Sequence, residues 1–204
     1  MLQINSLVIG AATASVFASL TFLSADAFGD PLRYSATFGA SNLTFERTAL
    51  ERESADLLGR LRRQVVDFSS REVPGSIIID TRSTYLYYVL GNGKAMRYGI
   101  GVGREGFTWS GTQSISRKAE WPDWSPPPEM IERQPYLPRL MAGGPGNPLG
   151  ARAMYLGGTV FRIHGTNDPT TIGGHVSSGC IRMTNEDVID LYERVSLGAR
   201  VTVL

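Results

Sequence analysis

Glycine and proline interrupt this chain at short intervals, which restricts it to short elements of secondary structure. The 204 residues include 23 Gly and 11 Pro, and both residue types favour turns and loops over long helices. Between the turns lie short runs rich in Ile, Val and Tyr, such as residues 76–80 and 84–90, a composition typical of β-strands. The sequence therefore predicts a mainly β fold and disfavours an all-helical bundle.

Composition narrows the classes of function. Twenty Lys and Arg against 19 Asp and Glu give a net charge of +1, and without blocks of like charge nothing indicates a nucleic-acid partner. One Cys and two His exclude an intramolecular disulfide and leave few ligands for a metal site. We therefore expect no metal and no cofactor, and a single thiol that has no scaffolding role.

The first 27 residues have the composition of a targeting segment. Residues 7–23 are almost wholly apolar or small, and Ala25 and Ala27 follow with the small-x-small spacing of a signal-peptidase site. The same stretch is long enough to be retained as a membrane anchor. We expect residues 1–27 to be a signal peptide or membrane anchor, and the protein to be exported to the periplasm or cell envelope.

The remaining chain divides into a preface and a β-rich body. Residues 28–73 comprise a linker and, from residue 45 to 68, apolar residues at the spacing of an amphipathic surface helix. Residues 74–204 form the body, which opens with a meander of antiparallel strands. We expect strands at residues 76–80, 84–90, 95–102, 153–156, 159–163 and 200–204, and a helix at residues 184–195 that Thr184 caps.

Residues 103–150 carry all three Trp and most of the Pro, and are expected to form a long loop. A loop of that length inside a compact domain is usually functional or mobile. The interleaved Trp and Pro of residues 121–128 either line a groove for an extended ligand or pin the loop to the sheet. The sequence leaves both interpretations open.

Both His and the only Cys fall within seventeen residues, at His164, His175 and Cys180. The strand at residues 159–163 delivers His164 at its end. Cys180 is expected just ahead of a helix, whose N–H groups, with Arg182, would lower the pKa of the thiol. An imidazole that takes the thiol proton makes a competent nucleophile, so the pattern indicates acyl transfer through a thioester with His164 as base.

The neighbours of this Cys fit the same chemistry. Gly179 leaves room for a substrate carbonyl beside backbone N–H groups that would form an oxyanion hole, and Arg182 could hold an anionic substrate group by a forked contact. Two alternatives stay open: a buried structural Cys, or a zinc site from His164, His175 and Cys180, whose spacing matches none of the usual ligand patterns. His175 is otherwise expected to be a solvated loop residue.

Two short segments around His164 and Cys180 match a known family signature more specifically. His164-Gly165-Thr166-Asn167, followed after a spacer by Ser177-Ser178-Gly179-Cys180-Ile181-Arg182-Met183, resembles the signature of the L,D-transpeptidase catalytic domain, also called the YkuD domain. The resemblance covers residues 74–204. It implies a β-sandwich-like domain with a few short helices, and an enzyme of peptidoglycan remodelling.

The resemblance also implies roles for individual residues. In that family the Cys attacks the carbonyl of the third, diamino-acid residue of a tetrapeptide stem, releases D-alanine and leaves a thioacyl-enzyme that an amine resolves. Here Cys180 would be the nucleophile, His164 the general base, and the Gly165 carbonyl the group that orients the imidazole. Substrate contacts are expected from Thr166, Ser177, Ser178, Gly179 and Arg182.

One departure and several alternatives remain. Many members have His directly before the Gly-Cys pair, whereas this chain has Ser178. The acceptor amine would belong to a second stem, giving a 3,3 cross-link, or to an envelope protein. Resolution by water or a free D-amino acid would instead give a carboxypeptidase or an exchange enzyme, and a silent wall-binding module is a further alternative. If His164 must be neutral, activity should fall as pH drops through about 6.5.

Overall fold

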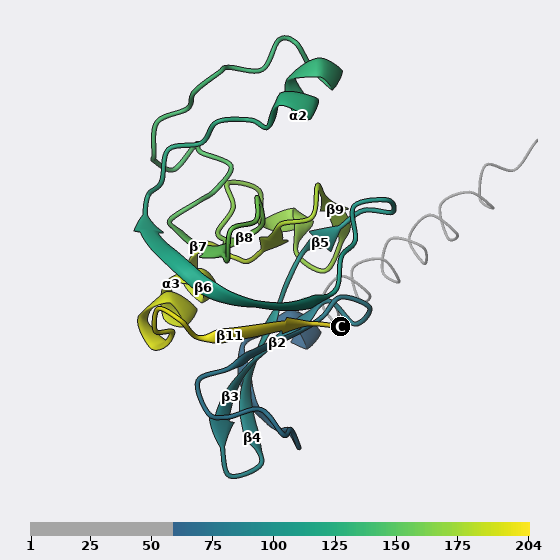
Figure 1. The fold of residues 1–204 in the computed structure, drawn as a ribbon, viewed down its shortest axis with the longest axis vertical. Helices are drawn as coiled ribbons and strands as arrows, with labels where there is room; N and C mark the ends of the chain where they lie inside the picture. The colour runs from purple at the N-terminus through teal and green to yellow at the C-terminus, as the bar shows by residue number, and fades with distance from the viewer. Residues whose placement is uncertain (1–58) are drawn as a thin grey trace, which may run out of the picture. The chain divides into compact units, whose positions relative to one another are not determined.

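The long strand β6 connects two β-layers that pack on one core (Figure 1). The computed structural model describes residues 59–204. The first residues of β6 pair with β11 and its last residues with β7, and the register of the β6–β7 pairing shifts between Ile115 and Arg117. Such an irregularity bends a strand, so the sheet folds over on itself in the order β1-β4-β3-β2-β11-β6-β7-β8-β10, and β5 and β9 form a separate pair. The strands are β1 (Gln64–Asp67), β2 (Ile77–Asp80), β3 (Tyr85–Gly91), β4 (Lys94–Gly99), β5 (Val102–Gly103), β6 (Gly111–Glu120), β7 (Arg152–Leu156), β8 (Arg162–His164), β9 (His175–Ser177), β10 (Ile181–Arg182) and β11 (Arg200–Val203); the helices are α2 (Pro128–Arg133), the 3-10 helix η1 (Pro169–Thr171) and α3 (Asn185–Arg194).

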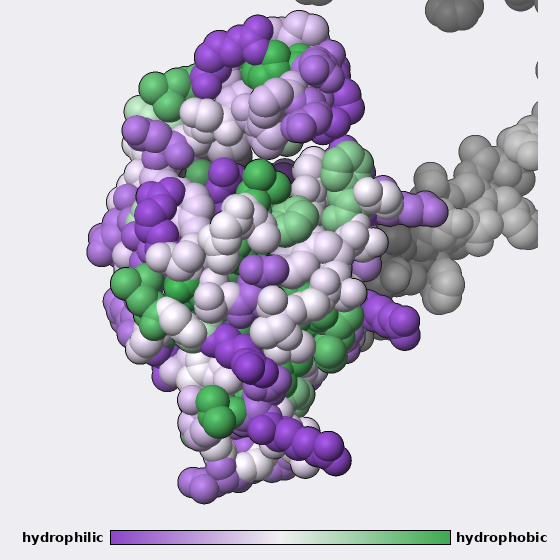
Figure 2. Space-filling model, in the orientation of Figure 1, coloured by the Kyte–Doolittle hydropathy of each residue, from purple (hydrophilic) through white to green (hydrophobic). Residues whose placement is uncertain are grey.

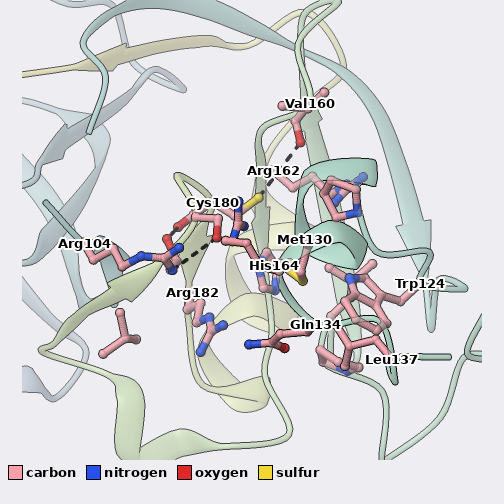
Figure 3. Close-up of a pocket in the computed structure, with 17 residues that line it drawn as sticks. Arg104, Trp124, Met130, Gln134, Leu137, Val160, Arg162, His164, Cys180 and Arg182 are labelled. Carbon is pink, nitrogen blue, oxygen red and sulfur yellow. Dashed lines mark hydrogen bonds between the residues drawn. The ribbon is translucent and has the colours of Figure 1, made fainter. Parts of the chain in front are cut away.

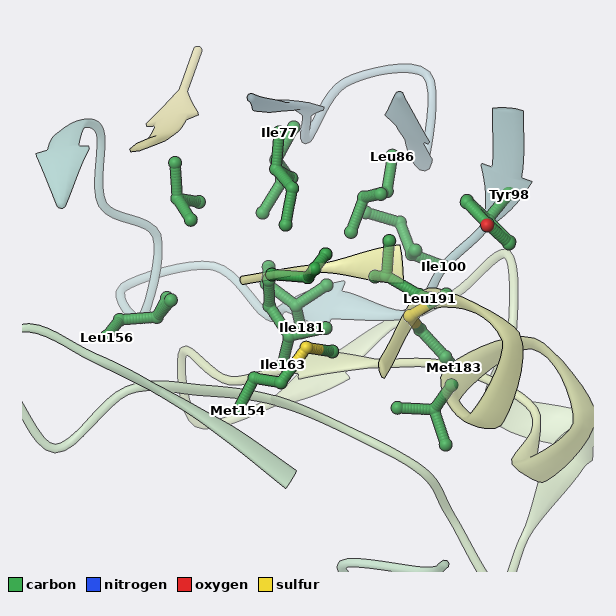
Figure 4. Close-up of a cluster of buried hydrophobic side chains, with 14 of the residues drawn as sticks. Ile77, Leu86, Tyr98, Ile100, Met154, Leu156, Ile163, Ile181, Met183 and Leu191 are labelled. Atoms are coloured by element: carbon green, nitrogen blue, oxygen red, sulfur yellow. The ribbon is translucent and has the colours of Figure 1, made fainter. Parts of the chain in front are cut away.

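The core lies between the two layers (Figure 4). Ile77 and Leu86 face it from β2 and β3, and Met154 and Ile163 face it from β7 and β8; all four are fully buried. Side chains on a strand alternate between its two faces, so each strand that sends one residue into this core turns that residue's neighbours to its other face. The expected mainly β sandwich with few helices is confirmed, as is the antiparallel meander of β2, β3 and β4.

The helix α3 closes one side of the core and carries the cap that the sequence predicts. The Thr184 side chain accepts a hydrogen bond from the N–H of Asp187 at 3.2 Å. Val188 and Leu191 are fully buried in the core. At the other end, the Lys118 ammonium on β6 donates to the carbonyls of Tyr192 and Val195, a favourable position for a cation at a helix C-terminus.

Two of these expectations about secondary structure were wrong. The helix expected to run to residue 68 gives way to strand β1, which pairs with β4. The loop expected at residues 103–150 contains β6 and α2. Only Ile115 of β6 is buried, so this strand lacks the apolar alternation that marks a strand in a sequence; pairing on both edges maintains it instead.

Several expectations lie outside the described residues: the signal peptide or membrane anchor at residues 1–27, the linker, and the predicted helix up to residue 58. Among residues 59–204, no helix is long and apolar enough to cross a membrane.

Removing the cap of α3 should lower the stability of the whole domain, because the helix packs on the core. We expect Thr184→Ala to lower the free energy of unfolding in urea by about 1 kcal/mol, the usual cost of losing a Thr cap. Thr184→Ser, which keeps the acceptor oxygen, is the matched control and should stay close to the parent. Equal stability of the Ala and Ser variants would contradict the assignment.

Candidate active site

A cavity of about 360 Å³ lies between the ends of β8 and β10 and the segment that carries α2 (Figure 3). In Figure 2 that segment stands as a separate lobe above a hollow in the surface. Cys180 and His164 both line the cavity from the sheet side, and Trp124, Met130 and Leu137 line it from the α2 side. The two residues that the sequence predicts for the chemistry therefore share one site.

Strand alternation explains why polar side chains gather on this face. Ile163 of β8 and Ile181 of β10 are register partners and both are buried in the core. Their neighbours must face the opposite way, so Arg162 and His164 of β8 and Arg182 of β10 point into the cavity. His164 pairs directly with Arg182. Extending the same register by one residue places Cys180 beside Arg162.

His164 is held as a neutral imidazole with a defined tautomer. Its side chain is buried, and Nδ1 lies 2.6 Å from the carbonyl oxygen of Gly165. Since a carbonyl can only accept, Nδ1 carries the proton and Nε2 is left as an acceptor. Burial, helped by the charges of Arg182 and Arg162 and opposed by the hydrogen bond to the Gly165 carbonyl, lowers the pKa of His164 to about 4. If His164 is the base, the loss of activity expected near pH 6.5 moves to about pH 4.

Cys180 is a half-buried free thiol, and burial raises its pKa. The guanidinium and backbone N–H of Arg162 and the charge of Arg182 act in the opposite direction but do not prevail. The expected helix start beside the thiol was wrong: strand β10 follows Cys180, and α3 begins only at Asn185. The sulfur contacts the carbonyl of Val160 at 4.0 Å and makes no hydrogen bond to the imidazole in this structure.

The loop before the thiol is fixed by its own side chains. The Ser177 hydroxyl donates to the carbonyl of Cys180 at 2.6 Å and accepts from the N–H of Gly179 at 3.1 Å. Gly179 has a φ of +102°, and a Cβ there would lie 2.5 Å from the Phe161 ring. Only glycine fits both constraints. The Ser177 hydroxyl is thus committed to the loop rather than open to a ligand.

An aromatic pair that the sequence analysis missed supports this loop. The rings of Trp109 and Phe161 stack with centroids 4.7 Å apart, and the Trp109 indole N–H donates to the Gly179 carbonyl at 2.8 Å. Trp109 comes from the segment before β6, about seventy residues away in the chain. The only available signal was the concentration of Trp in residues 103–150.

The turn after His164 is fixed by Asn185, at the start of α3. The Asn185 Oδ1 accepts from the N–H groups of Ala151 and Thr166, at 2.9 Å and 3.3 Å, and a Cβ on Gly165 would lie 2.3 Å from that oxygen. Thr166 is buried and does not line the cavity; its hydroxyl bonds to the backbone of Asp168. These contacts fix the Gly165 carbonyl in the position where it accepts the hydrogen bond from Nδ1 of His164.

The second histidine lies elsewhere. His175 is exposed on β9 and lines a different cavity, together with Trp109. The zinc site that the sequence left open needs His175 beside Cys180, and the structure does not place it there. Within residues 59–204 no three His, Cys, Asp or Glu side chains form a group that could hold a metal ion.

The two interpretations of the Trp- and Pro-rich segment each hold for part of it. Trp124 and Pro127 line the cavity, as a groove requires, whereas Trp121 is exposed and lies outside the lining. The structure also adds cavity residues that the sequence analysis missed, above all Arg104 and Arg162. They carry no local motif, and only the fold brings them to Cys180.

This geometry agrees with the comparisons with known proteins. The L,D-transpeptidase catalytic domain (YkuD) model matches residues 74–203, and the chain belongs to this family. The probable L,D-transpeptidase ErfK/SrfK of Escherichia coli K12 is 36% identical over 137 residues, which cover 63% of this chain and 43% of that protein. The chain thus matches less than half the length of that relative.

A solved L,D-transpeptidase structure shares the fold, and a second structure matches in sequence. The catalytic domain of the Enterococcus faecium L,D-transpeptidase matches with a TM-score of 0.51 at 18% identity, over 66% of this chain and 100% of that chain. A probable carnitine operon oxidoreductase from Brucella melitensis is 52% identical, over 70% of this chain and 93% of that chain, with a TM-score of 0.48.

The protonation of His164 can be measured directly, because the chain has only two His. In a His175→Gln variant the remaining imidazole should titrate by NMR at a pKa of about 4. Adding Arg182→Gln should raise that value, because the Arg182 charge opposes protonation. An imidazole that titrates at its ordinary value of about 6.5 in the folded protein would contradict a buried imidazole that is neutral at pH 7.

Proposed function

We propose that this protein is an exported L,D-transpeptidase that acts on the tetrapeptide stems of peptidoglycan. The observation that carries the proposal is that one cavity holds the only thiol of the chain and a buried imidazole whose Nδ1 proton is fixed by the Gly165 carbonyl. Family membership supports the same activity. Export follows from the composition of residues 1–27.

In the acylation step, the thiol proton of Cys180 passes to Nε2 of His164 while Sγ attacks the carbonyl carbon of the diamino-acid residue. The carbon–nitrogen bond to D-alanine then breaks, and the imidazolium returns the proton to the leaving amine. The sum is one new carbon–sulfur bond, one broken amide bond, and a proton moved from sulfur to nitrogen.

The acceptor amine completes the reaction. It attacks the thioester carbon, gives a proton to His164, and displaces the sulfur, which takes that proton back and becomes a thiol again. An amine of a second stem gives a 3,3 cross-link, and a lysine of an envelope protein would anchor that protein to the wall. No net proton is gained or lost by the pair.

The surroundings of Cys180 suit the negative charge that develops during these steps. The Gly179 N–H is committed to Ser177, whereas the N–H of Cys180 has no partner among residues 59–204 and is the donor we assign to the oxyanion. Arg162 favours the thiolate over the thiol. Donors that are already in place stabilise a charge as it forms without reorganising.

The intact mass of the protein after incubation with a tetrapeptide stem tests this proposal. We expect the parent to gain the mass of the stem minus D-alanine, and Cys180→Ala to gain nothing. His164→Gln should form the adduct about a hundredfold to ten-thousandfold more slowly, the usual range for losing a general base. His175→Gln, which removes the histidine outside the cavity, is the matched control and should behave like the parent.

The products separate the alternatives. A cross-linked dimer of stems supports the transpeptidase, while a tripeptide alone indicates hydrolysis and an exchanged D-amino acid indicates the exchange enzyme. If the protein binds the stem but forms no adduct and releases no D-alanine, the result would contradict the enzymatic proposal and favour a wall-binding module.

A further inference from the structure

The cavity holds more positive charge than the proposed chemistry uses. Four arginines line it, and no Asp or Glu is among its lining residues. Within residues 59–204 none of the four forms a salt bridge, although other arginines of the domain do. Arg162 and Arg182 flank the Cys180–His164 pair, which leaves Arg104 and Arg133. Grouped guanidinium charges of this kind favour an anionic ligand.

Arg104 is the better placed of these two because it is held on three sides. Its backbone N–H donates to the Ser177 carbonyl at 3.0 Å, and its Nη1 donates to the Ser178 hydroxyl at 3.3 Å. Its guanidinium also lies over the Phe107 ring, 4.1 Å from the ring centre. A side chain fixed in this way loses less conformational entropy when it binds a ligand.

The position of Arg104 also gives Ser178 a role. Ser178 stands two residues before the nucleophile, where many relatives have a histidine. Here the serine hydroxyl accepts a hydrogen bond from Arg104, so a permanent cation from β5 and its following turn reaches this side of the cavity. In Figure 3 the Arg104 side chain approaches Cys180 from the side opposite Trp124 and Leu137.

We propose that Arg104, positioned by Ser178 and Phe107, binds a carboxylate of the donor peptide and makes the site selective for stems whose carboxyl groups are free. This inference rests on the proposed function, because that function supplies the peptide. Two carboxylates of a tetrapeptide stem lie beside the reacting carbonyl: the terminal carboxyl of D-alanine, and the side-chain carboxyl of a dicarboxylic diamino acid. A planar guanidinium matches either one with two parallel hydrogen bonds.

Calorimetric binding to the full-length Cys180→Ala variant tests the inference without turnover. Three peptides are compared: the free-acid tetrapeptide stem, the stem amidated at its terminal carboxyl, and the stem amidated at its side-chain carboxyl. We expect one amidation to weaken binding about tenfold to a hundredfold, the range for a hydrogen bond between charged groups. The amidation that does so identifies which carboxylate Arg104 binds.

Adding Arg104→Gln should abolish this discrimination, so that the acid and the sensitive amide bind equally weakly. Arg104→Lys, which keeps the charge but not the fork, should retain part of the preference and serves if the Gln variant does not fold. Arg139→Gln is the matched control: it removes one charge from an exposed arginine outside the cavity and should leave the preference intact. Ser178→Ala should reduce the preference without abolishing it.

Two results would overturn the inference: neither amidation affects binding, or Arg104→Gln discriminates as strongly as the parent. Either can occur while the wild-type protein still forms the thioacyl adduct, so the proposed function would survive. Absence of an adduct with all three peptides would instead remove the proposed function, and the inference would fall with it.

Discussion

The parallel pairing of β8 with β10 is the constraint on which the site depends. Ile163 and Ile181 are register partners in the core. Because side chains alternate along a strand, the residues on either side of them face the cavity. One register therefore brings together Arg162, His164 and Arg182 and presents Cys180 at the edge. A slip of one residue would send the arginines and the imidazole into the apolar core and the isoleucines into the site.

Burial and the arginine charges set the resting state of the thiol and the imidazole; they oppose each other at the thiol and act together at the imidazole. Burial disfavours both the thiolate and the imidazolium, while the arginines favour the thiolate and disfavour the imidazolium. Burial prevails for the thiol, so the resting pair is neutral. In the proposed reaction, the arginines would stabilise the charge that develops and, for Arg104, the charge that the substrate carries. The neutral imidazole is ready to accept a proton at neutral pH because no titration near pH 6.5 limits it.

Site residues that lie in a short local motif could be predicted from the sequence. Site residues that the fold brings together from distant segments could not. His164, Gly165 and Cys180 lie in two short motifs, and the cap of α3 has a local signature at Thr184, so both were accessible. Arg104 and Trp109 reach the site only because β5 pairs with β9 and the following loop packs beneath Gly179. Strand β6 is polar along most of its length and shows no periodicity.

The pKa of the Cys180 thiol likewise depends on residues that only the fold brings close to it. From sequence alone, a helix start and Arg182 were expected to lower it, because local charge is visible in the chain and burial is not. In the structure, β10 intervenes before α3, and the surrounding residues desolvate the sulfur.

The protonation state of the lone cysteine tests this account most directly. Thiolate has a distinct ultraviolet absorbance, and because the chain has one Cys, the difference between the parent and Cys180→Ala reports Cys180 alone. We predict no thiolate signal at pH 7, and a signal that appears only above the ordinary thiol pKa of about 8.5. A full thiolate signal at pH 7, lost on acidification together with a protonated His164, would show a resting ion pair and contradict the account.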